Sequence, residues 1–470
     1  MNPVTLAQLV SAVDGQAVGV DSLRTVRRVE IDSRRIESGD VFWAVRGERL
    51  DGHDYVADAV QNGAAVCVVS SERAERISGP KIVVRDTLTA LADFARWYRN
   101  QQSATVIGVT GSVGKTTTRR MIHTVLGASL PGVESPENFN NHFGLPLSLL
   151  GIEKGDRYAV MELGASHVGE IRDLAAIARP HIGVVTAVEL AHVSTFGSLD
   201  HITIAKGELP EALPADGLAV LAGDDARVRG MSARTRARVV CVGEGPENEI
   251  RPTWVKSIPG RLSFRLDGRD YSLAGTGRHV LVSALAAVAV AREFGVPAAD
   301  VARGFEAYRP MPGRGVIRRF GAVTVIDDTY NANPGSMRAA IHILRDWAGP
   351  GRCIFVAGDM LELGTYSAGC HRQLGEEAVA CGIHGIIALG HFAGDVVEGA
   401  RLSGHRDGQL RACTTLTEVT ATLEDWLQPG DVVLVKGSRG MRMERVVEWL
   451  EDAWGIKPKE KETPRLRASA

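Results

Sequence analysis

A glycine-rich segment carries the clearest chemical signal in the sequence. Residues 108–117 read Gly-Val-Thr-Gly-Ser-Val-Gly-Lys-Thr-Thr; they overlap a β-branched run at 105–109 and lead into a helical stretch from about Lys115. In a strand–loop–helix unit of this kind, backbone N–H groups and the helix N-terminus bind phosphate, and the lysine reaches the outer phosphates. The segment predicts a nucleoside triphosphate site made of Gly111, Ser112, Gly114, Lys115, Thr116 and Thr117, with the Thr116 hydroxyl as a Mg²⁺ ligand. The strict Walker pattern has a glycine where Val109 stands, so a glycine turn with an incidental lysine is the alternative.

Three further side chains follow the apolar runs that come after this segment. Glu162 ends the run at 158–161, His192 follows the run at 182–186, and Lys206 follows a short helical stretch. The carboxyl ends of parallel strands meet at the crevice where such sheets bind ligands, so these groups and Thr116 are candidates for one metal site. Spacing alone leaves three alternatives open. These are a helix-start carboxylate for Glu162, a hydrogen-bonded structural imidazole for His192 and a solvated surface ammonium for Lys206.

The elements that must position these groups fall into three blocks of alternating apolar strands and helical stretches. This alternation predicts an α/β protein with a small α/β domain at 1–103, a central phosphate-loop domain with a doubly wound parallel sheet at 104–312, and a Rossmann-like domain at 313–456. Predicted strands of the central block lie at 105–109, 158–161, 182–186 and 218–221, and those of the last block at 323–326, 353–356, 385–389 and 432–435. The tail at 457–470 is charged and poor in apolar residues, so we expect it to be disordered.

Composition limits the class of protein. The 470 residues suggest two to four domains, and 44% hydrophobic with 23% charged residues is typical of a soluble globular chain. A net charge of -2 provides no bulk attraction to nucleic acid or to an anionic membrane, and no apolar run reaches the ~20 residues of a membrane span. The six cysteines form no CxxC pair, which indicates a reducing compartment, and no signal peptide is evident. We therefore expect a cytoplasmic protein that binds no nucleic acid.

A series of short motifs runs along all three blocks. The first block has Asp-Ser-Arg at 32–34, Gly-Asp-Val-Phe at 39–42 and Asp-Gly-His at 51–53. Besides the glycine-rich loop, the second has Asn-Phe-Asn-Asn at 138–141, Gly-Leu-Pro at 144–146, Glu-Leu-Gly-Ala at 162–165, Ala-His at 191–192 and Ala-Lys-Gly-Glu at 205–208. The third has Asp-Asp-Thr-Tyr-Asn-Ala-Asn-Pro at 327–334, Gly-Asp-Met-Leu-Glu-Leu-Gly at 358–364 and Lys-Gly-Ser-Arg at 436–439. Together these motifs resemble the Mur ligase superfamily, and within it the MurF type, over nearly the whole chain except the tail.

The resemblance implies an activity and its small-molecule partners. It implies an ATP-dependent ligase that adds D-alanyl-D-alanine to UDP-N-acetylmuramoyl-tripeptide in peptidoglycan synthesis, through an acyl-phosphate intermediate. Such a chain is expected to act as a monomer. Two rivals stay open: another Mur-type or folylpolyglutamate-type ligase, and a nucleotide-binding protein without ligase turnover.

The resemblance also implies roles for single residues. Lys115 would hold the β- and γ-phosphates, Thr116 and Glu162 one Mg²⁺, and His192 with Glu162 a second. Lys206 matches the lysine that the family carbamylates, and Arg314 matches an arginine that reaches the γ-phosphate, so Lys115, Lys206, His192 and Arg314 are the catalytic candidates. Asp327 and Asn331 match positions that contact the adenosine part. The substrate-binding candidates are Ser33 and Arg34 for the uridine diphosphate, Asn140 and Asn141 for the muramoyl peptide, and Asp359, Glu362, His371, Lys436 and Arg439 for the amine.

Each motif also has a purely structural interpretation, and three positions depart from the family pattern. The motifs at 32–34 and 51–53 could be turns, the one at 327–334 a helix cap, and the one at 138–141 a polar loop. The motifs at 358–364 and 436–439 could be strand-to-helix connections without a ligand. Val113 stands where the family has asparagine in the phosphate loop, and Val280 and Ser283 lack the amides of the usual HNxxNA motif. These departures affect the expected fit of the nucleotide more than the expected chemistry.

Overall fold

The computed structural model describes residues 1–47, 50–136, 138–347 and 351–455, so the tail predicted to be disordered lies outside the described residues. The chain forms two compact units. The first is made of Met1–Lys256, Leu262–Ala274 and Arg278–Arg309, and the second of Ser257–Arg261, Gly275–Gly277 and the chain from Pro310 onward. The first unit contains the sheets of both the first and the second predicted domain. In the part of the chain that the structure describes, no helix is long and apolar enough to cross a membrane.

The amino-terminal part of the first unit is a small mixed sheet with helices. Its strands lie in the order β2 (Gln16–Val18), β7 (Lys81–Val84), β6 (Val66–Ser70), β5 (Val41–Trp43) and β4 (Val29–Glu30). Only the β2–β7 pair is antiparallel, and β1 (Val4–Thr5) pairs separately with β3 (Thr25–Val26). The helices are α1 (Leu6–Ala12), α2 (Val56–Gln61) and α3 (Thr87–Asn100). The Asp86 carboxylate caps α3 by accepting from the Thr89 N–H at 2.7 Å, and Trp43 stacks on Phe94 of this helix.

The second sheet of this unit is fully parallel and explains the continuous apolar runs of the sequence. Its strands lie in the order β13 (Arg238–Val242), β12 (Leu218–Ala222), β11 (Ile182–Val185), β8 (Thr105–Thr110), β10 (Tyr158–Glu162) and β9 (Gly132–Glu134). The chain order reverses about β8, because β9 and β10 lie on one side of it and β11 to β13 on the other. Ligands of doubly wound sheets bind at the carboxyl ends of the strands beside such a reversal. The predicted α/β fold class and doubly wound parallel sheet are confirmed.

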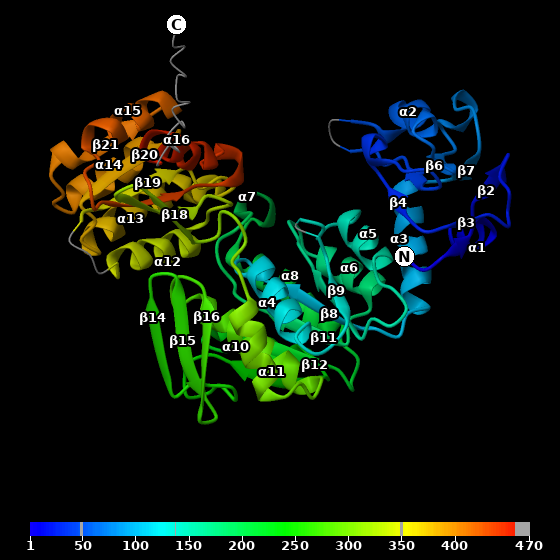
Figure 1. The fold of residues 1–470 in the computed structure, drawn as a ribbon, viewed down its shortest axis with the longest axis horizontal. Coiled ribbons are helices and arrows are strands. Elements are labelled where there is room, and N and C mark those ends of the chain that lie inside the picture. The colour runs from blue at the N-terminus through cyan, green and yellow to red at the C-terminus, as the bar shows by residue number, and fades with distance from the viewer. Residues whose placement is uncertain (48–49, 137, 348–350, 456–470) are drawn as a thin grey trace, which may run out of the picture. The chain divides into compact units, whose positions relative to one another are not determined.

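The helices of this sheet include one that is apolar on almost every side. They are α4 (Lys115–Leu126), α5 (Gly144–Leu150), α6 (Glu170–Ala178), α7 (Val193–Phe196), α8 (Leu199–Glu211), α9 (Ala226–Gly230), α10 (Val280–Glu293) and α11 (Ala298–Ala307). Helix α10 is almost wholly buried and packs against α4, beside which it runs in Figure 1. A helix that is hydrophobic all round must lie in the core. Val280 and Ser283, which depart from the family pattern, therefore lie on a core helix that contacts the helix of the phosphate loop.

Several strands were not predicted from the sequence, among them two groups that are half exposed. A three-stranded sheet follows in the order β14 (Trp254–Ile258), β15 (Arg261–Leu266) and β16 (Arg269–Ala274). From Pro310 onward, the first strand of the second unit is β17 (Val316–Phe320), which runs antiparallel to the predicted strand β18 (Val323–Asp328) at the edge of the sheet. Both are short and half exposed, so they lack the continuous apolar run that identified the central strands.

The remaining strands of the second unit are parallel, as predicted. After β17 and β18 the order is β22 (Val432–Lys436), β19 (Cys353–Gly358), β20 (Gly385–Leu389) and β21 (Leu410–Cys413). The helices are α12 (Pro334–Arg345), α13 (Ser367–Ala380), α14 (Ala393–Leu402), α15 (Leu416–Trp426) and α16 (Glu444–Trp454). Asn333 and Ser336 form a capping box at the start of α12, with Pro334 in the first turn. The end of the motif at 327–334 is therefore a helix cap, as the structural interpretation predicted.

Candidate functional site

The phosphate loop connects β8 to α4 with a backbone that requires glycine. Gly111 has φ +144° and Gly114 has φ +84°, both outside the range that side chains favour. A Cβ atom on Gly111 would lie 2.1 Å from the Thr186 hydroxyl, so the close approach of another segment excludes any larger residue there. The loop thus has the strand–loop–helix setting that the sequence predicted.

The segment after β11 is hydrogen-bonded to this loop. The Thr186 hydroxyl donates to the Val113 carbonyl at 2.5 Å and lies 3.2 Å from the Thr110 carbonyl. The Ser112 N–H donates to the Ala187 carbonyl at 2.9 Å, and the Ser112 hydroxyl accepts from the Glu189 N–H at 3.0 Å. Ser112 was predicted to bind nucleotide, but its backbone N–H is directed to the neighbouring segment in this structure.

Lys115 and Thr116 begin α4 with different surroundings. The half-buried Lys115 ammonium donates to the Gly111 carbonyl at 2.8 Å, so it lies back across the phosphate loop. Thr116 is buried, and its hydroxyl donates to Oε2 of Glu162 at 2.9 Å. The two predicted Mg²⁺ ligands from separate motifs are therefore in direct contact.

Glu162 is the last residue of β10 and is 3% exposed. Its Oε1 accepts from the Asn140 amide at 2.9 Å, and the guanidinium of Arg119 lies 3.9 Å from its Oε2. Helix α6 does not begin until Glu170, so the interpretation of Glu162 as a helix-start carboxylate is wrong. The carboxylate instead stands at the carboxyl end of the sheet, beside the phosphate loop.

A carboxylate and a hydroxyl at this position are the hard oxygen donors that Mg²⁺ prefers, so the Thr116–Glu162 pair fits the predicted ion. Among the described residues, no group of three or more His, Cys, Asp and Glu side chains is placed to hold a metal. The predicted metal site contains only two such side chains, Glu162 and His192. Its other proposed ligands are Thr116 and Lys206, so the absence of a larger cluster does not test it. His192 has φ +54° at the start of α7, where its carbonyl accepts from the Phe196 N–H.

Lys206 is a buried amine. It lies on α8 and is 3% exposed, so its interpretation as a solvated surface lysine is wrong. Burial, together with the nearby Lys115 ammonium, lowers the pKa of Lys206 from 10.5 to about 7 against the opposing effect of Glu170, Glu208 and Glu162. Its Nζ lies 5.5 Å from the centroid of the Phe196 ring. At neutral pH a large share of this amine carries no proton and has a lone pair available for bonding.

Other residues of the central motifs form hydrogen bonds with the backbone of nearby helices. The buried Glu208 carboxylate accepts from the Gly169 and Arg172 N–H groups at the start of α6. The Asn141 side chain accepts from the Gly144 N–H at 2.9 Å and so holds the start of α5. Asn140 and Asn141 were both predicted to bind the muramoyl peptide. In this structure the side chain of Asn140 orients Glu162, and that of Asn141 caps a helix.

Ser283, one of the departures from the family pattern, contacts the helix of the phosphate loop. Its hydroxyl lies 2.8 Å from that of Thr118, and both side chains are buried. The position occupied by an amide in the family is therefore used here for a contact between α10 and α4. Val280 is the buried first residue of α10.

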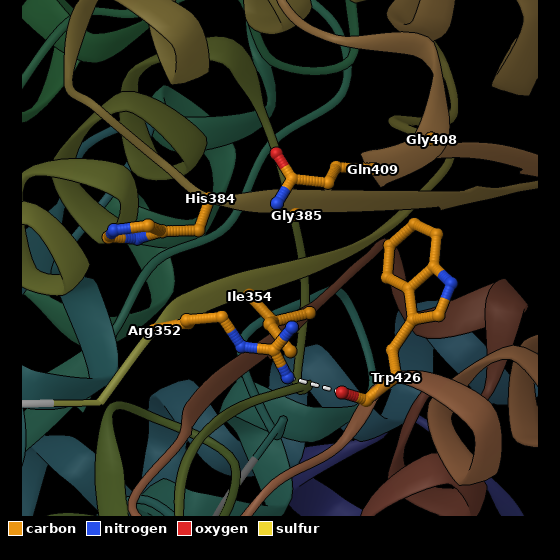
Figure 2. Close-up of a pocket in the computed structure, with 7 residues that line it drawn as sticks. All are labelled: Arg352, Ile354, His384, Gly385, Gly408, Gln409 and Trp426. Atoms are coloured by element: carbon orange, nitrogen blue, oxygen red, sulfur yellow. Dashed lines mark hydrogen bonds between the residues drawn. The ribbon is translucent and has the colours of Figure 1, made fainter.

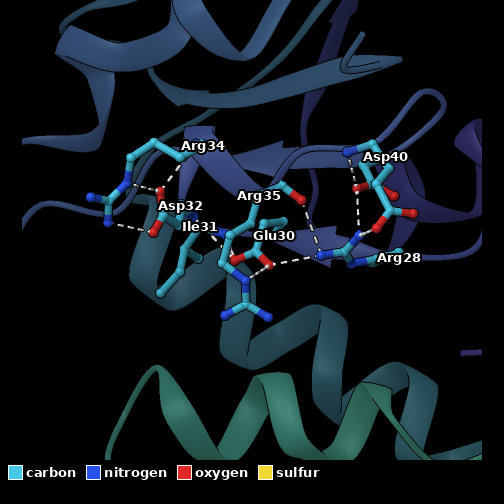
Figure 3. A network of polar contacts seen from close by, with 8 residues as sticks. Arg28, Glu30, Ile31, Asp32, Arg34, Arg35 and Asp40 are labelled. Atoms are coloured by element: carbon cyan, nitrogen blue, oxygen red, sulfur yellow. Dashed lines mark hydrogen bonds and ion pairs between the residues drawn. The ribbon is translucent and has the colours of Figure 1, made fainter. Parts of the chain in front are cut away.

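In the amino-terminal sheet, the motif at 32–34 lies in a dense network of ion pairs (Figure 3). The Arg34 guanidinium is exposed and pairs with Asp32 at 2.7 Å, while the buried Ser33 accepts from the Asn62 amide through its carbonyl. The buried Glu30 carboxylate binds the Ile31 and Asp32 N–H groups and pairs with Arg28. This motif is a turn, as the structural interpretation held, and it also presents a cation to solvent.

The Asp-Gly-His motif at 51–53 is a rigid turn. Asp51 accepts from both the backbone N–H and the Nδ1 of His53, and Nε2 of His53 accepts from the Ser70 N–H at 2.9 Å. His53 therefore links this turn to β6.

In the second unit, the motifs at 327–334 and 436–439 are bound to each other. Lys436 is buried, pairs with Asp328 at 2.7 Å and donates to the Asn331 carbonyl at 2.9 Å. The Asn331 side chain accepts from the Arg439 N–H at 3.3 Å, and Asp327 accepts from the Thr329 hydroxyl. Both motifs follow neighbouring parallel strands, β18 and β22, which brings their loops together.

The side chains of His371 and Asp359, which were predicted to bind the amine, form hydrogen bonds within the fold. His371 is 1% exposed; its Nε2 accepts from the Met360 N–H and its Nδ1 donates to the Ser367 carbonyl. Asp359 accepts from the His391 and Phe392 N–H groups. In this structure both side chains therefore form hydrogen bonds that hold the loop at 358–364. Glu362 is exposed at the tip of this loop, with φ +65°.

Arg314 lies over an aromatic ring. Its guanidinium is 4.0 Å from the centroid of Tyr330, and that of Arg439 is 5.9 Å from the same ring. The flanking Gly313 and Gly315 have φ values of +69° and +68°. Tyr330 thus brings together two arginines predicted for different roles.

A cavity in the second unit lies away from these motifs. Figure 2 shows it between Arg352, His384, Gln409 and Trp426. Arg352 and His384 precede β19 and β20, whereas the motifs at 358–364 and 436–439 follow the strands β19 and β22. The cavity is therefore at the amino ends of the parallel strands, opposite the end at which such sheets bind ligands.

Sequence reasoning missed three residues that the structure places in these sites. Arg119 follows Thr116 by one helical turn, so both side chains lie on the same face of α4. Because Thr116 binds Glu162, this spacing could have predicted that Arg119 lies beside Glu162 as well. Thr186 directly follows β11, and Tyr330 lies inside a motif that was already recognised. For Thr186 the sequence held no signal, because its partner is 73 residues away.

Comparisons with known proteins agree with this arrangement. Family models match residues 25–99 (Mur ligase family, catalytic domain), 109–291 (Mur ligase middle domain) and 313–439 (Mur ligase, glutamate ligase domain). The chain is 33% identical over 459 residues to the UDP-N-acetylmuramoyl-tripeptide--D-alanyl-D-alanine ligase of Escherichia coli, covering 96% of this chain and 99% of that relative.

Two solved structures extend the agreement to the fold. A crystal structure of MurF from Acinetobacter baumannii matches with a TM-score of 0.87 at 33% identity, covering 96% of this chain and 99% of that one. A MurF ligase from Thermotoga maritima in complex with ADP matches with a TM-score of 0.78 at 30% identity, covering 91% and 97%.

Proposed function

The chain belongs to the Mur ligase family, and we propose that it is an ATP-dependent ligase that joins D-alanyl-D-alanine to UDP-N-acetylmuramoyl-tripeptide in peptidoglycan synthesis. The observation that carries the proposal is the buried contact between Thr116 and Glu162. In the proposed site these two oxygen donors would hold Mg²⁺ beside the phosphate loop, and nearly full-length relatives carry this activity in their names.

The chemistry follows from the poor reactivity of a carboxylate toward amines. A carboxylate oxygen of the tripeptide attacks the γ-phosphorus of ATP, an O–P bond forms, and the bond to the β,γ-bridging oxygen breaks to release ADP. The amine nitrogen of D-alanyl-D-alanine then attacks the acyl carbon, phosphate leaves and the nitrogen loses a proton. Catalysis of the first step rests on positioning and on offsetting charge, because phosphoryl transfer needs little covalent assistance from the protein.

The residues of the central site suit this first step. We propose that Lys115 turns from the Gly111 carbonyl to the β- and γ-phosphates when ATP binds. Gly111, Gly114 and Thr117 contribute to the same phosphate cradle, and Arg314, Asp327 and Asn331 are the proposed nucleotide ligands of the second unit. Thr116 with Glu162, and Glu162 with His192, would hold two Mg²⁺ ions, which offset negative charge on the phosphates when bound.

Lys206 is proposed to supply further oxygen ligands after carbamylation. Its unprotonated amine adds to CO₂, forming an N–C bond and releasing a proton, and the product is an anion with two oxygens. The support is the burial of Lys206 and the lowering of its pKa to about 7, since an ammonium cannot undergo this addition. Activity of Lys206→Ala should rise when short carboxylic acids are supplied, and an absence of rescue would argue against a ligand role.

The residues proposed to bind the two substrates differ in how strongly the structure supports their roles. Arg34 is exposed and cationic, which suits a diphosphate, and Ser33 lies in the same turn. Arg439 and Glu362 are exposed in the second unit and suit the charged ends of a dipeptide. Lys436, Asp359 and His371 are buried and are proposed to hold the loops that present those groups.

We further propose that the chain acts in the cytoplasm as a monomer, with one amino-terminal, one central and one carboxyl-terminal domain at 1–103, 104–312 and 313–456. The names of the relatives mention small-molecule substrates and no nucleic acid.

The test is phosphate release by the purified chain with ATP, Mg²⁺ and UDP-N-acetylmuramoyl-tripeptide. We expect release to require D-alanyl-D-alanine and to be lost in Lys115→Met. Equal release with a single amino acid would indicate another Mur-type ligase, and release with a folate and glutamate would indicate a folylpolyglutamate-type ligase. ATP binding without release in any mixture would indicate a nucleotide-binding protein without ligase turnover. Each of these three outcomes would overturn the proposal.

A further inference from the structure

The segment at 186–189 is bound to the phosphate loop by a set of hydrogen bonds that the proposed reaction does not use. Three different residues of this segment bind three different residues of the loop. The Thr186 hydroxyl binds the carbonyls of Thr110 and Val113, the Ala187 carbonyl accepts from the Ser112 N–H, and the Glu189 N–H donates to the Ser112 hydroxyl. The contacts span the loop from the last residue of β8 to the residue before Gly114.

Thr186 is suited to this contact by its burial and its place in the sheet. It is 7% exposed and directly follows β11, which pairs with β8, so the main chain of the sheet sets its distance from the loop. The Thr186 N–H also donates to the Thr110 carbonyl at 3.0 Å. A β-branched side chain has few rotamers, so the hydroxyl loses little freedom in making the bond.

The fit between the two segments is close. A Cβ on Gly111 would lie 2.1 Å from the Thr186 hydroxyl and 3.1 Å from the Ala187 nitrogen. At Gly114 a Cβ would lie 3.8 Å from the Thr186 Cβ, an ordinary van der Waals distance, so both positive-φ glycines of the loop face Thr186. The backbone of the phosphate loop at Gly111 is therefore packed directly against Thr186.

We propose that Thr186 is a positioning residue that holds the phosphate loop in its nucleotide-binding conformation before ATP arrives, with Ser112 as the second point of attachment. The inference rests on the proposed function and names a residue that acts on the loop without touching the substrate. A loop that is ordered in advance loses less entropy on binding, so the hydroxyl contributes to nucleotide affinity. The same segment continues to His192, so its attachment also fixes the start of the chain that carries this proposed metal ligand.

The experiment replaces the hydroxyl while keeping the shape of the side chain. Thr186→Val is isosteric and removes the donor to the Val113 carbonyl, whereas Thr186→Ser keeps the donor. Thr422→Val is the matched control, because Thr422 is also a buried threonine whose hydroxyl donates to a carbonyl, that of Glu418 at 2.8 Å in α15. The measurements are the Kd of ADP by calorimetry, the KM of each substrate and the thermal unfolding midpoint.

We expect Thr186→Val to raise the Kd of ADP and the KM of ATP roughly ten-fold, and to leave the KM of D-alanyl-D-alanine within about two-fold of the wild type. Thr186→Ser should restore the ADP affinity to within about two-fold, and Thr422→Val should leave it unchanged. The inference is overturned if folded Thr186→Val binds ADP as the wild type does, if Thr186→Ser is as weak as Thr186→Val, or if the KM values of all substrates rise together.

ADP binding does not depend on turnover, so the two proposals fail in different ways. A wild-type chain that binds ADP but forms no amide contradicts the proposed function alone. An active wild type with an unaffected Thr186→Val variant contradicts only the positioning role. Should Thr186→Val fail to fold, Ser112→Ala removes the acceptor of the Glu189 N–H and tests the second attachment; unchanged ADP affinity in a folded Ser112→Ala protein would also overturn the inference.

Discussion

The hydroxyl of Thr116 donates to the carboxylate of Glu162 at 2.9 Å, across the boundary between α4 and β10. Thr116 follows the lysine of the phosphate loop, and Glu162 ends the neighbouring strand, so one contact joins the two motifs that phosphoryl transfer requires. Asn140 occupies the other oxygen of Glu162, which fixes the orientation of the carboxylate.

Replacing Glu162 with glutamine should remove charge while keeping the shape and the Thr116 contact. We expect Glu162→Gln to lower kcat by at least about a hundred-fold, because an amide binds Mg²⁺ far more weakly than a carboxylate does. Titration of the rate with Mg²⁺ should show a higher requirement for the ion. If Glu162→Gln has the wild-type kcat at ordinary Mg²⁺ concentrations, Glu162 is not a metal ligand.

The neighbouring arginines Arg119 and Arg120 should differ in their effect on stability. Arg119 is 2% exposed and binds Glu134 near Glu162, whereas Arg120 is partly exposed and pairs with the same Glu134. We expect Arg119→Met to cost about 3 kcal/mol of unfolding free energy, because buried carboxylates lose their cation. Arg120→Met is the matched control and should cost under about 1 kcal/mol. Urea unfolding of both variants is the measurement, and equal losses would contradict the difference in burial.

Gly111→Ala should abolish nucleotide binding through a collision in addition to backbone strain. Gly155 also has a positive φ, but a Cβ there meets nothing within 4 Å. Gly155→Ala therefore measures the strain alone, which is about 1 kcal/mol. We expect Gly111→Ala to lose measurable ADP binding and Gly155→Ala to retain it. Similar ADP affinities in the two variants would show that the contact with Thr186 does not constrain the loop.

Acid should destabilise the second unit through His371. Burial lowers the pKa of His371 below its ordinary value of 6.5, despite the Ser367 carbonyl and Asp359, so the folded state binds fewer protons than the unfolded state. Its contribution to stability is fully present above about pH 6.5 and is lost as the pH falls through the lower folded pKa. In His371→Gln, which keeps an acceptor for the Met360 N–H, the unfolding midpoint should fall less between pH 7 and pH 5 than in the wild type. His181→Gln, at an exposed position, should keep the wild-type slope; an unchanged slope in His371→Gln would contradict the assignment.

The sequence alone was sufficient wherever a property depends on neighbours in the chain. The phosphate loop, the central parallel strands and the helix cap at Asn333 follow from local conformation and apolar pattern, and the structure confirms each of them. Edge elements such as β17 and β14 were missed, because half-exposed strands lack that pattern.

What only the tertiary structure decided is the partner of each polar side chain. The register of β8 against β10 and β11 brings Glu162 to Thr116 and Thr186 to Val113, and both pairs are far apart in the chain. Packing elsewhere buries Lys206 on α8 of the first unit and His371 and Asp359 in the second unit, although by residue type alone these three were as suited to a ligand as to the fold. The sequence thus determined which chemistry the chain can perform, and packing across the sheets determined which polar side chains are buried and which partners they bind, because burial and hydrogen-bond partners are properties of the folded contacts.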